Sequence, residues 1–408
     1  MKQNKWLRIL ILSLFIPSMI LASGQYLSPL PVPTQVVINL DTESCNSSCL
    51  KKYYEEGMIF SFLANINESN QNSKILEYMN EALGQSEVSE IPYYLEGKKE
   101  AFNIALFFPR KSIGRYSTST ANVILSYLLY QKGNFNFEIF DTLSESQEDI
   151  ANTLQIIEAK GYKKAIGILT YEGANNLNAL QPQIEIFIPS VNASQITDSL
   201  ASNITWGGIA YDEQIKKLSN LGKASPAVSF YDSGFIGQQM NQSVAKYNDE
   251  VIYSHAFDLK DISRFPEVIK KVRGSLRNAK IFLNTPVTSS SVILSQLTYN
   301  DIKHLGVYSP QINYNPSLLS ITQEKDRQNL FIANSITPID SQFVEQTHLL
   351  HADLEYDWIN YATAYGIEYF YLKSIPRTKR LFKERVKNHQ VEYKIEILSP
   401  QANRFSPI

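Results

Sequence analysis

The chain has 408 residues, which is enough for about two or three domains of ~100–200 residues, each with a core of its own. Its 38 basic and 40 acidic residues give a net charge of -2, which argues against a nucleic-acid binder because such a protein carries a basic surplus. Its two cysteines are too few for a disulfide scaffold or a four-thiolate zinc site.

The first residues have the three-part pattern of a secretory signal peptide. Basic residues near the start are followed by an apolar run over residues 9–21 and by small residues at 22–24. The apolar run is shorter than the ~20 residues that span a bilayer, so an uncleaved anchor is the less favoured alternative. No cysteine lies at the cleavage region, which argues against lipid attachment. We therefore predict a signal peptide over residues 1–23 and a periplasmic protein with no stable membrane span after its removal.

A small helical segment is predicted before the main domain. Residues 24–42 are rich in proline and then extended, which predicts a tether. Apolar residues recur at helical spacing over residues 43–65 and again over residues 75–83. This pattern predicts a helical hairpin, followed by a polar linker, within residues 43–100.

The two cysteines lie in this helical segment. Cys45 and Cys49 are four positions apart, so a helix would place them on one face, ~6 Å apart at Cα. An oxidising compartment favours a bond between them. The spacing therefore predicts a Cys45–Cys49 disulfide that fixes the start of a helix, with redox-active thiols or metal ligands as alternatives.

Strands and helices alternate from residue 102 onward. The apolar strand segments are FNIALFFP, FEIFDT, KKAIGIL and IEIFIPS in a first series, and PAVSFYD, EVIYSHAF, AKIFLNTP, KHLGVYSP and NLFIANSI in a second. Nearly all-apolar strands separated by helices are typical of parallel sheets that helices cover on both faces. The sequence therefore predicts an α/β fold with two doubly wound, mostly parallel sheets.

Two successive α/β series in one chain predict two lobes with a cleft between them. We assign residues 101–210 and 341–408 to lobe 1, with the alternating tail VEYKIEIL as a final edge strand, and residues 211–340 to lobe 2. Ligands bind in such folds beyond the carboxyl ends of the strands. Closure of the cleft would be a hinge motion at the crossings near residues 205–212 and 335–350.

Four stretches of the chain resemble the type 1 periplasmic-binding proteins. They are IALFFPRKSIGRYSTSTANVIL, AIGILTYEGANNLNAL, VSFYDSGFIGQQMNQSV and AKIFLNTPVTSSSVILSQLTYNDIKHLGVYSPQINYNP. The sequences of these stretches are most similar to the receptor-like domain of penicillin-binding-protein activator lipoproteins, and branched-chain amino-acid receptors share the same fold. The resemblance covers about residues 102–375 and implies a two-lobed binding domain preceded by a small helical segment.

The chain also departs from these relatives. The activators are lipoproteins, whereas no cysteine stands at the cleavage region here. Solute receptors tend to have a Ser/Thr-rich turn after the third strand that grips an amino-acid carboxylate. Here the corresponding residues are Thr170, Tyr171, Glu172 and Gly173, and Glu172 is a poor neighbour for a second carboxylate because like charges repel. The resemblance therefore implies the fold more strongly than it implies an amino-acid ligand.

A ligand in the cleft would meet polar residues at the strand ends, although such residues are also ordinary turn residues. The candidates are Arg115, Tyr116, Thr170, Tyr171, Ser190, Asn192, Tyr211, Asp232, Ser233, Thr285 and Ser309.

The chain contains no G-x-S-x-G, H-E-x-x-H or P-loop motif. Ser48 and Lys51 match S-x-x-K, but a match with two fixed positions arises often by chance and no companion motif accompanies it. His348 and His351 are spaced for one helix face and could bind a metal, but polar residues are common at a crossing between lobes. We therefore predict no enzymatic activity, no metal and no cofactor.

These observations lead to two functional hypotheses. The first is a non-enzymatic periplasmic protein whose receptor-like domain binds a protein partner or a cell-wall component in the bacterial envelope. The alternative is a periplasmic receptor that delivers a small ligand, such as an amino acid, to a transporter. Neither hypothesis involves nucleic acid.

Overall fold

The protein is represented by a computed structural model that describes residues 45–67, 69–82, 101–258, 260, 262–375 and 378–408. The predicted signal peptide (1–23), the tether (24–42) and the linker after the helical hairpin (85–100) lie outside these residues. The chain divides into two compact units, Met1–Gly97 and Lys98–Ile408, which are described separately below.

The described part of the first unit contains three helices. They are α2 (Ser47–Glu55), α3 (Ile59–Asn65) and α4 (Ser73–Ala82). The sequence predicted one helix over residues 43–65, which is wrong because the chain turns between α2 and α3. Gly57 lies at this turn with φ 72°, a left-handed conformation that glycine adopts without strain. The predicted hairpin is therefore a three-helix unit.

The three helices bury a small core of their own. Leu50, Phe62 and Ile75, one from each helix, are almost fully buried. The rings of Tyr54 and Tyr78 stack against this core with centroids 4.3 Å apart. Apolar contact between all three helices explains how so short a segment can fold, because isolated helices of this length are marginal in water.

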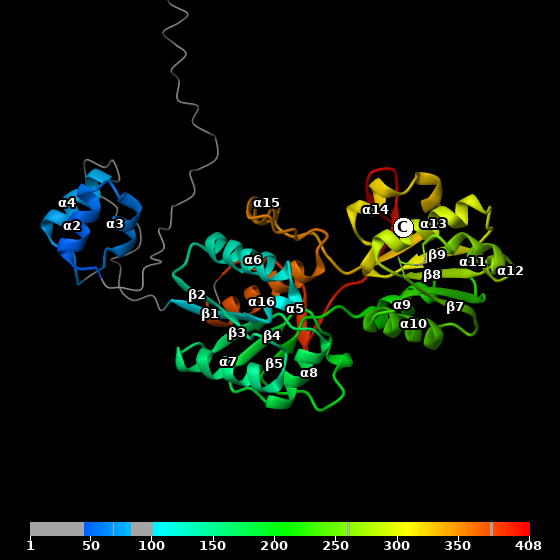
Figure 1. Ribbon diagram of the computed structural model, residues 1–408, viewed down its shortest axis with the longest axis horizontal. Helices are drawn as coiled ribbons and strands as arrows, with labels where there is room; N and C mark the ends of the chain where they lie inside the picture. Colours follow the sequence, from blue (N-terminus) through cyan, green and yellow to red (C-terminus); the bar gives the residue numbers. More distant parts are fainter. Residues whose placement is uncertain (1–44, 68, 83–100, 259, 261, 376–377) are drawn as a thin grey trace, which may run out of the picture. The chain divides into compact units, whose positions relative to one another are not determined.

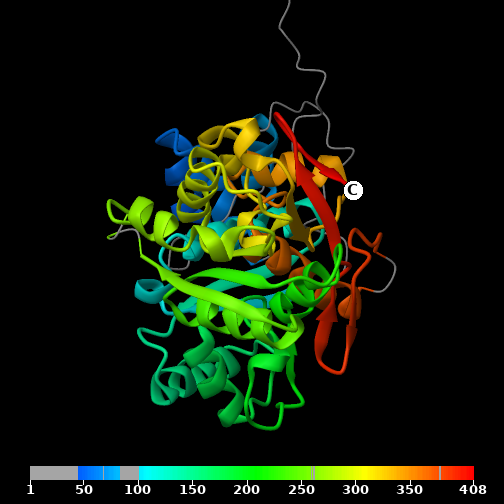
Figure 2. The ribbon, with the colours of Figure 1, turned by 90° about the vertical axis from the view of Figure 1, so that its right-hand side faces the viewer.

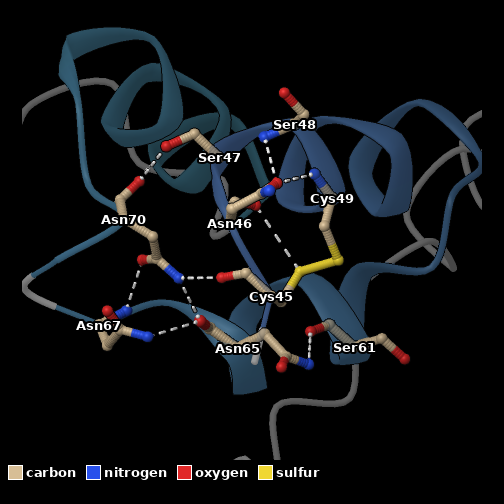
Figure 3. The surroundings of a disulfide bond; sticks show 9 residues. All are labelled: Cys45, Asn46, Ser47, Ser48, Cys49, Ser61, Asn65, Asn67 and Asn70. Carbon is tan, nitrogen blue, oxygen red and sulfur yellow. Dashed lines mark hydrogen bonds between the residues drawn. A yellow bond between two sulfur atoms is a disulfide. The ribbon is translucent and has the colours of Figure 1, made fainter. Parts of the chain in front are cut away.

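A disulfide closes the start of the first helix, as Figure 3 shows. It joins Cys45 to Cys49, with a Cα–Cα distance of 5.4 Å. Cys45 lies just before the helix, and the Asn46 side chain caps α2 by accepting hydrogen bonds from the N–H groups of Ser48 and Cys49 at 3.1 and 3.0 Å. The buried Asn70 amide donates to the Cys45 carbonyl at 2.8 Å. The bond and these caps together fix the helix start, as the spacing of the cysteines predicted.

The second unit contains two seven-stranded sheets (Figure 1). The first sheet has the order β11-β12-β5-β4-β3-β1-β2. Its strands are β1 (Phe102–Phe108), β2 (Phe135–Asp141), β3 (Lys164–Gly167), β4 (Glu185–Ile188), β5 (Ile204–Trp206), β11 (Arg385–Lys387) and β12 (Gln390–Glu392). The strands pair in parallel except for β11 and β12, which form an antiparallel hairpin.

Helices cover both faces of this sheet, and the sheet and its helices together form what we call lobe 1. They are α5 (Arg110–Ile113), α6 (Tyr116–Gln131), α7 (Gln147–Ala159), α8 (Tyr171–Leu180), α15 (Ser341–Leu349) and α16 (Trp358–Ser374). Helices α6, α15 and α16 share one buried cluster with the sheet, and α7 and α8 share another. Strand β1 is buried on both faces after Asn103, which explains its unbroken apolar run.

The second sheet, which we call lobe 2, has the order β14-β13-β10-β9-β8-β6-β7. Its strands are β6 (Ala227–Asp232), β7 (Val251–Phe257), β8 (Lys280–Asn284), β9 (Gly306–Ser309), β10 (Leu330–Asn334), β13 (Glu396–Pro400) and β14 (Phe405–Pro407). Its helices are α9 (Tyr211–Ser219), α10 (Phe235–Tyr247), α11 (Phe265–Lys271), α12 (Arg273–Leu276), α13 (Val287–Tyr299) and α14 (Pro316–Ile321). Helices α9 and α10 share one buried cluster, and α11 and α13 share another.

The chain passes between the lobes three times: from β5 to α9, from β10 to α15, and from β12 to β13. The prediction gave all of residues 341–408 to lobe 1. Strand pairing corrects it, because β13 pairs with β10 of lobe 2 while β12 pairs with β5 of lobe 1. Figure 2 shows this C-terminal segment, in red, passing from one sheet to the other. The tail VEYKIEIL is therefore two strands with a crossing between them.

The predicted fold class is confirmed: the second unit is an α/β structure with two mostly parallel sheets in two lobes. Among the described residues, no helix has the length and apolar character needed to cross a bilayer.

Candidate binding face between the lobes

The turn that follows β3 is occupied by a carboxylate of the protein itself. Thr170 is the N-cap of α8, and its backbone N–H donates to Oε1 of Glu145 at 2.6 Å. The Thr170 hydroxyl donates to the other oxygen of the same carboxylate. Glu145 comes from the loop between β2 and α7, and its backbone carbonyl accepts from the Asn176 amide of α8 at 2.8 Å. An anion is favourable at this position because the first N–H groups of a helix lack partners within the helix.

The turn after β4 is also closed by bonds within the chain. The Ser190 hydroxyl donates to the Leu169 carbonyl at 2.5 Å, which links the two neighbouring turns. Asn192 is buried and donates from its amide to the Gly208 carbonyl at 2.9 Å, at the crossing into lobe 2. Its Oδ1 accepts from the Ser194 N–H at 3.0 Å. These two predicted site residues therefore have partners in the protein itself.

Two contacts join the lobes at this edge. The ring of Tyr171, at the start of α8 in lobe 1, stacks on Phe235, at the start of α10 in lobe 2, with centroids 4.4 Å apart. Beside it, the Gln195 amide donates to Oε1 of Gln239 in α10 at 2.8 Å. The ends of α8 and α10 therefore face each other, and we call the surface formed by residues at these helix starts the inter-lobe face.

Arg115 and Tyr116 lie at the start of α6 on the same lobe. The Arg115 guanidinium lies 3.7 Å from the Asp357 carboxylate and 5.1 Å from the centre of the Tyr116 ring. Burial raises the pKa of Asp357, and the positive charge of Arg115 opposes that shift. The side chain of Arg115 is 79% exposed, so most of its charge faces water.

The start of α9 brings Tyr211 of lobe 2 close to Tyr116 of lobe 1. Burial raises the pKa of the Tyr211 hydroxyl, and the nearby Tyr116 adds to the shift. The next residue, Asp212, is held by Tyr247, Ser243 and Lys246 of the same lobe. Burial acts to raise the pKa of Asp212, but these hydrogen bonds and the Lys246 charge outweigh it and lower that pKa.

Asp232 and Ser233 lie at the end of β6, beside Phe235. The Asp232 carboxylate accepts from the Gly234 N–H at 2.8 Å, an ordinary turn contact, and Ser233 is exposed. Phe235 is 45% exposed and Ile236 is 37% exposed. The lobe 2 side of the inter-lobe face therefore presents apolar surface to solvent.

Thr285 and Ser309 do not lie on the inter-lobe face. Both are fully buried inside lobe 2. The Thr285 hydroxyl pairs with Ser290 at 2.8 Å, and the Ser309 hydroxyl donates to the Leu283 carbonyl at 2.8 Å. Asn313 completes the network with bonds to Ser290 and Ser309. In this structure both residues stabilise the ends of β8 and β9, and a ligand between the lobes would not reach them.

Among the described residues, no three His, Cys, Asp or Glu side chains are grouped as metal ligands. His348 lies 3.9 Å from the Glu355 carboxylate at the end of α15, and His351 follows with φ 56°. Cys49, between Ser48 and Lys51 of the S-x-x-K match, is engaged in the disulfide, and Lys51 pairs with Glu55 at 3.5 Å. None of these residues adds a catalytic arrangement to the inter-lobe face.

The sequence analysis did not predict four residues that make contacts at this face, namely Glu145, Gln195, Phe235 and Gln239. Glu145 stands between two serines in a loop and contacts Thr170, twenty-five positions away. Phe235 follows Gly234 at the start of an amphipathic helix, so its pattern is that of an ordinary core residue. An apolar residue at the first position of a helix beyond a strand end is the one signal that could have indicated it.

No protein-family model matches the chain, and no curated protein matches it in sequence. Solved structures do match. A branched-chain amino acid ABC transporter protein from Thermus thermophilus with bound valine aligns with a TM-score of 0.57 and 12% identity, covering 76% of this chain and 95% of that one. The substrate-binding protein LivJ from Streptococcus pneumoniae, in complex with isoleucine, aligns with a TM-score of 0.55 and 12% identity, covering 75% and 98%.

The C-domain of LpoA from Haemophilus influenzae, described as a regulator of PBP1A, aligns with a TM-score of 0.48 and 14% identity, covering 75% of this chain and 99% of that one. The first two similarities establish the type 1 periplasmic-binding fold that the sequence predicted.

Proposed function

We propose that this is a non-enzymatic protein of the bacterial envelope whose two-lobed domain binds a protein partner or a cell-wall component. The observation that carries the proposal is the Glu145 carboxylate at the start of α8. It takes the N–H and hydroxyl of Thr170, in the turn that solute receptors tend to use for an amino-acid carboxylate. A small carboxylate ligand would have to displace a group that is tethered in place.

The free energy of the Thr170–Glu145 hydrogen bonds can be compared with the free energy of ligand binding. A hydrogen bond to a charged group contributes ~1.5–3 kcal/mol, and partial exposure of the Thr170–Glu145 pair favours the lower end. A ligand that must first break this contact binds about tenfold to a hundredfold more weakly, since ~1.4 kcal/mol corresponds to a factor of ten. The released Glu145 would also repel the incoming carboxylate.

The rival function is a solute receptor that feeds a transporter. It is favoured by the fold, since two structures similar to this chain are described with bound valine and isoleucine. The signal peptide predicted over residues 1–23 suits both functions, because each places the protein outside the inner membrane.

Isothermal titration calorimetry with valine, isoleucine and leucine distinguishes the two functions. We expect no saturable heat with the wild-type protein. The Glu145→Ala variant, with the start of α8 free, is the matched comparison and measures how much Glu145 contributes to the exclusion. Saturable binding of any of these amino acids to the wild-type protein at micromolar concentration would overturn the proposal.

A further inference from the structure

Lobe 1 carries a groove that the inter-lobe face does not use. It consists of two adjoining hollows of about 220 and 460 Å³ beside the C-terminal half of α16. Both hollows are lined by Tyr369, Lys373 and Val386, so they are parts of one groove between α16 and the β11–β12 hairpin. Figure 2 shows this hairpin as the lower of the two red segments.

The groove changes in chemistry along its length. Its middle is lined by the rings and aliphatic side chains of Tyr369, Leu372 and Val386. One end is lined by the polar side chains of Ser202, Asn203 and Thr205 and by Glu185. The other end is lined by Arg380, Arg385 and Glu368. The Arg380 guanidinium already donates to the Phe382 and Glu384 carbonyls, and the Glu368 carboxylate accepts from backbone N–H groups, so Arg385 has the free charge at this end.

The polar end has an unused hydrogen-bond acceptor. Oε1 of Glu185 pairs with Lys373 at 2.6 Å, but its Oε2 is buried and has no hydrogen-bond partner among the described residues. A buried carboxylate oxygen without a partner is unfavourable. The Glu185 side chain is 40% exposed, so a rotation of its carboxylate would bring this oxygen to an N–H donor of a ligand in the groove. Peptide backbone supplies such donors at every non-proline residue.

The segment beside the other end is strongly basic. Residues 378–389 contain five lysines or arginines and one acidic residue, Glu384. Glu384 is buried and accepts from the Tyr361 and Thr337 hydroxyls, so its charge is directed inward.

Some of these cations are already paired. Lys379 pairs with Asp340 at 3.1 Å, and Lys387 pairs with Glu392 at 3.5 Å. Lys383 and Arg385 are exposed and have no ion pair in the described part of the chain. The rim of the groove therefore has positive charge without a partner.

We propose that this groove binds an acidic, extended segment of a partner protein that also carries an apolar side chain. The apolar side chain would fill the middle of the groove, the carboxylates would pair with Arg385 and its basic neighbours, and a backbone N–H would reach Glu185. Arginine clusters recognise acidic motifs in this way. A membrane surface fits less well, because it offers no row of N–H donors. The inference rests on the proposed role as a protein-binding domain.

Fluorescence anisotropy of the full chain with a labelled peptide tests the inference. The probe is a short glutamate peptide containing one phenylalanine, and its two counterparts replace the glutamates with glutamine or the phenylalanine with serine. We expect saturable binding of the probe, clearly weaker binding of both counterparts, and loss of affinity at high salt because exposed charges are screened. The Arg385→Glu variant should weaken binding about tenfold or more.

The Lys270→Glu variant is the matched control, since Lys270 is an exposed and unpaired lysine on lobe 2. Equal affinity of the wild-type and Arg385→Glu proteins would overturn the inference, as would an equal loss in Lys270→Glu. So would equal binding of the serine counterpart, which would leave only nonspecific attraction between charges. None of these outcomes bears on the amino-acid calorimetry, so a failure of this site is distinguishable from a failure of the proposed function.

Discussion

Replacing Glu145 by alanine removes the group that caps α8 from outside. The side chain of Thr170 makes no capping bond of its own, so the start of the helix depends on the loop between β2 and α7. Loss of a capping acceptor usually costs ~0.5–2 kcal/mol. Since the pair is partly exposed, we expect a loss of about 1 kcal/mol in the free energy of unfolding. The second unit, Lys98–Ile408, has an unfolding entropy of ~2.1 cal/mol/K per residue, so this loss corresponds to a decrease of about 1.5 °C in Tm.

The assay is thermal unfolding followed by circular dichroism, combined with hydrogen exchange of the amides at the start of α8. Glu145→Gln keeps an acceptor but loses the charge, so its loss of stability should be smaller than that of Glu145→Ala. Glu250→Ala is the control, because Glu250 is exposed and its side chain has no hydrogen bond or ion pair in the described residues. Faster exchange should appear at Thr170 and its neighbours alone.

The reasoning would be refuted if Glu145→Ala unfolded at the wild-type temperature with unchanged exchange at Thr170. A loss of stability equal to that of Glu250→Ala would refute it too, because the effect would then follow from surface charge. Either result would mean that the Thr170–Glu145 contact does not persist in solution, and it would remove the main support for excluding a small carboxylate ligand.

The fold of the second unit could be predicted because its strands are short, apolar and separated by helices. Segments such as FNIALFFP and AKIFLNTP are buried on both faces of a sheet, and that pattern is local in sequence. The C-terminal tail was assigned incorrectly because strand pairing is not local. Val391 and Leu398 both lie in strands of one alternating segment, yet Tyr393 donates to the Gly207 carbonyl at 2.7 Å and the chain crosses to the other lobe after it.

The candidate site was predictable only in part, for a similar reason. A polar residue at a strand end can face a ligand or close a turn, and the sequence around Ser309 or Thr170 does not distinguish these roles. The hydrogen-bond partner in the folded chain distinguishes the two roles. Ser309 bonds to the Leu283 carbonyl inside lobe 2, whereas Thr170 bonds to a carboxylate from a neighbouring loop. Glu145 could not be found from one sequence because both its loop and its partner are fixed by the packing of α7 beside α8.

Two further predictions concern stability. Arg327 is buried and donates hydrogen bonds to the carbonyl oxygens of Leu319, Thr322, Gln401 and Ala402. We expect Arg327→Lys to lower the free energy of unfolding, measured with urea, by about 2 kcal/mol or more, because lysine cannot make all of these bonds. Arg277 is exposed, so Arg277→Lys is the control and should change this free energy little. For His304, burial lowers the pKa of the imidazole from its usual 6.5. The unfolded chain therefore binds a proton more readily than the folded one, and this contribution is present above about pH 6.5 and lost as pH falls below it. Compared with His304→Gln, the wild-type protein should lose more stability between about pH 7.5 and 5.5, measured as urea midpoints, because the variant cannot take up that proton. Parallel pH profiles for the two proteins would contradict this prediction. Every other titrating group is present in both proteins, so a difference between the profiles can come only from His304.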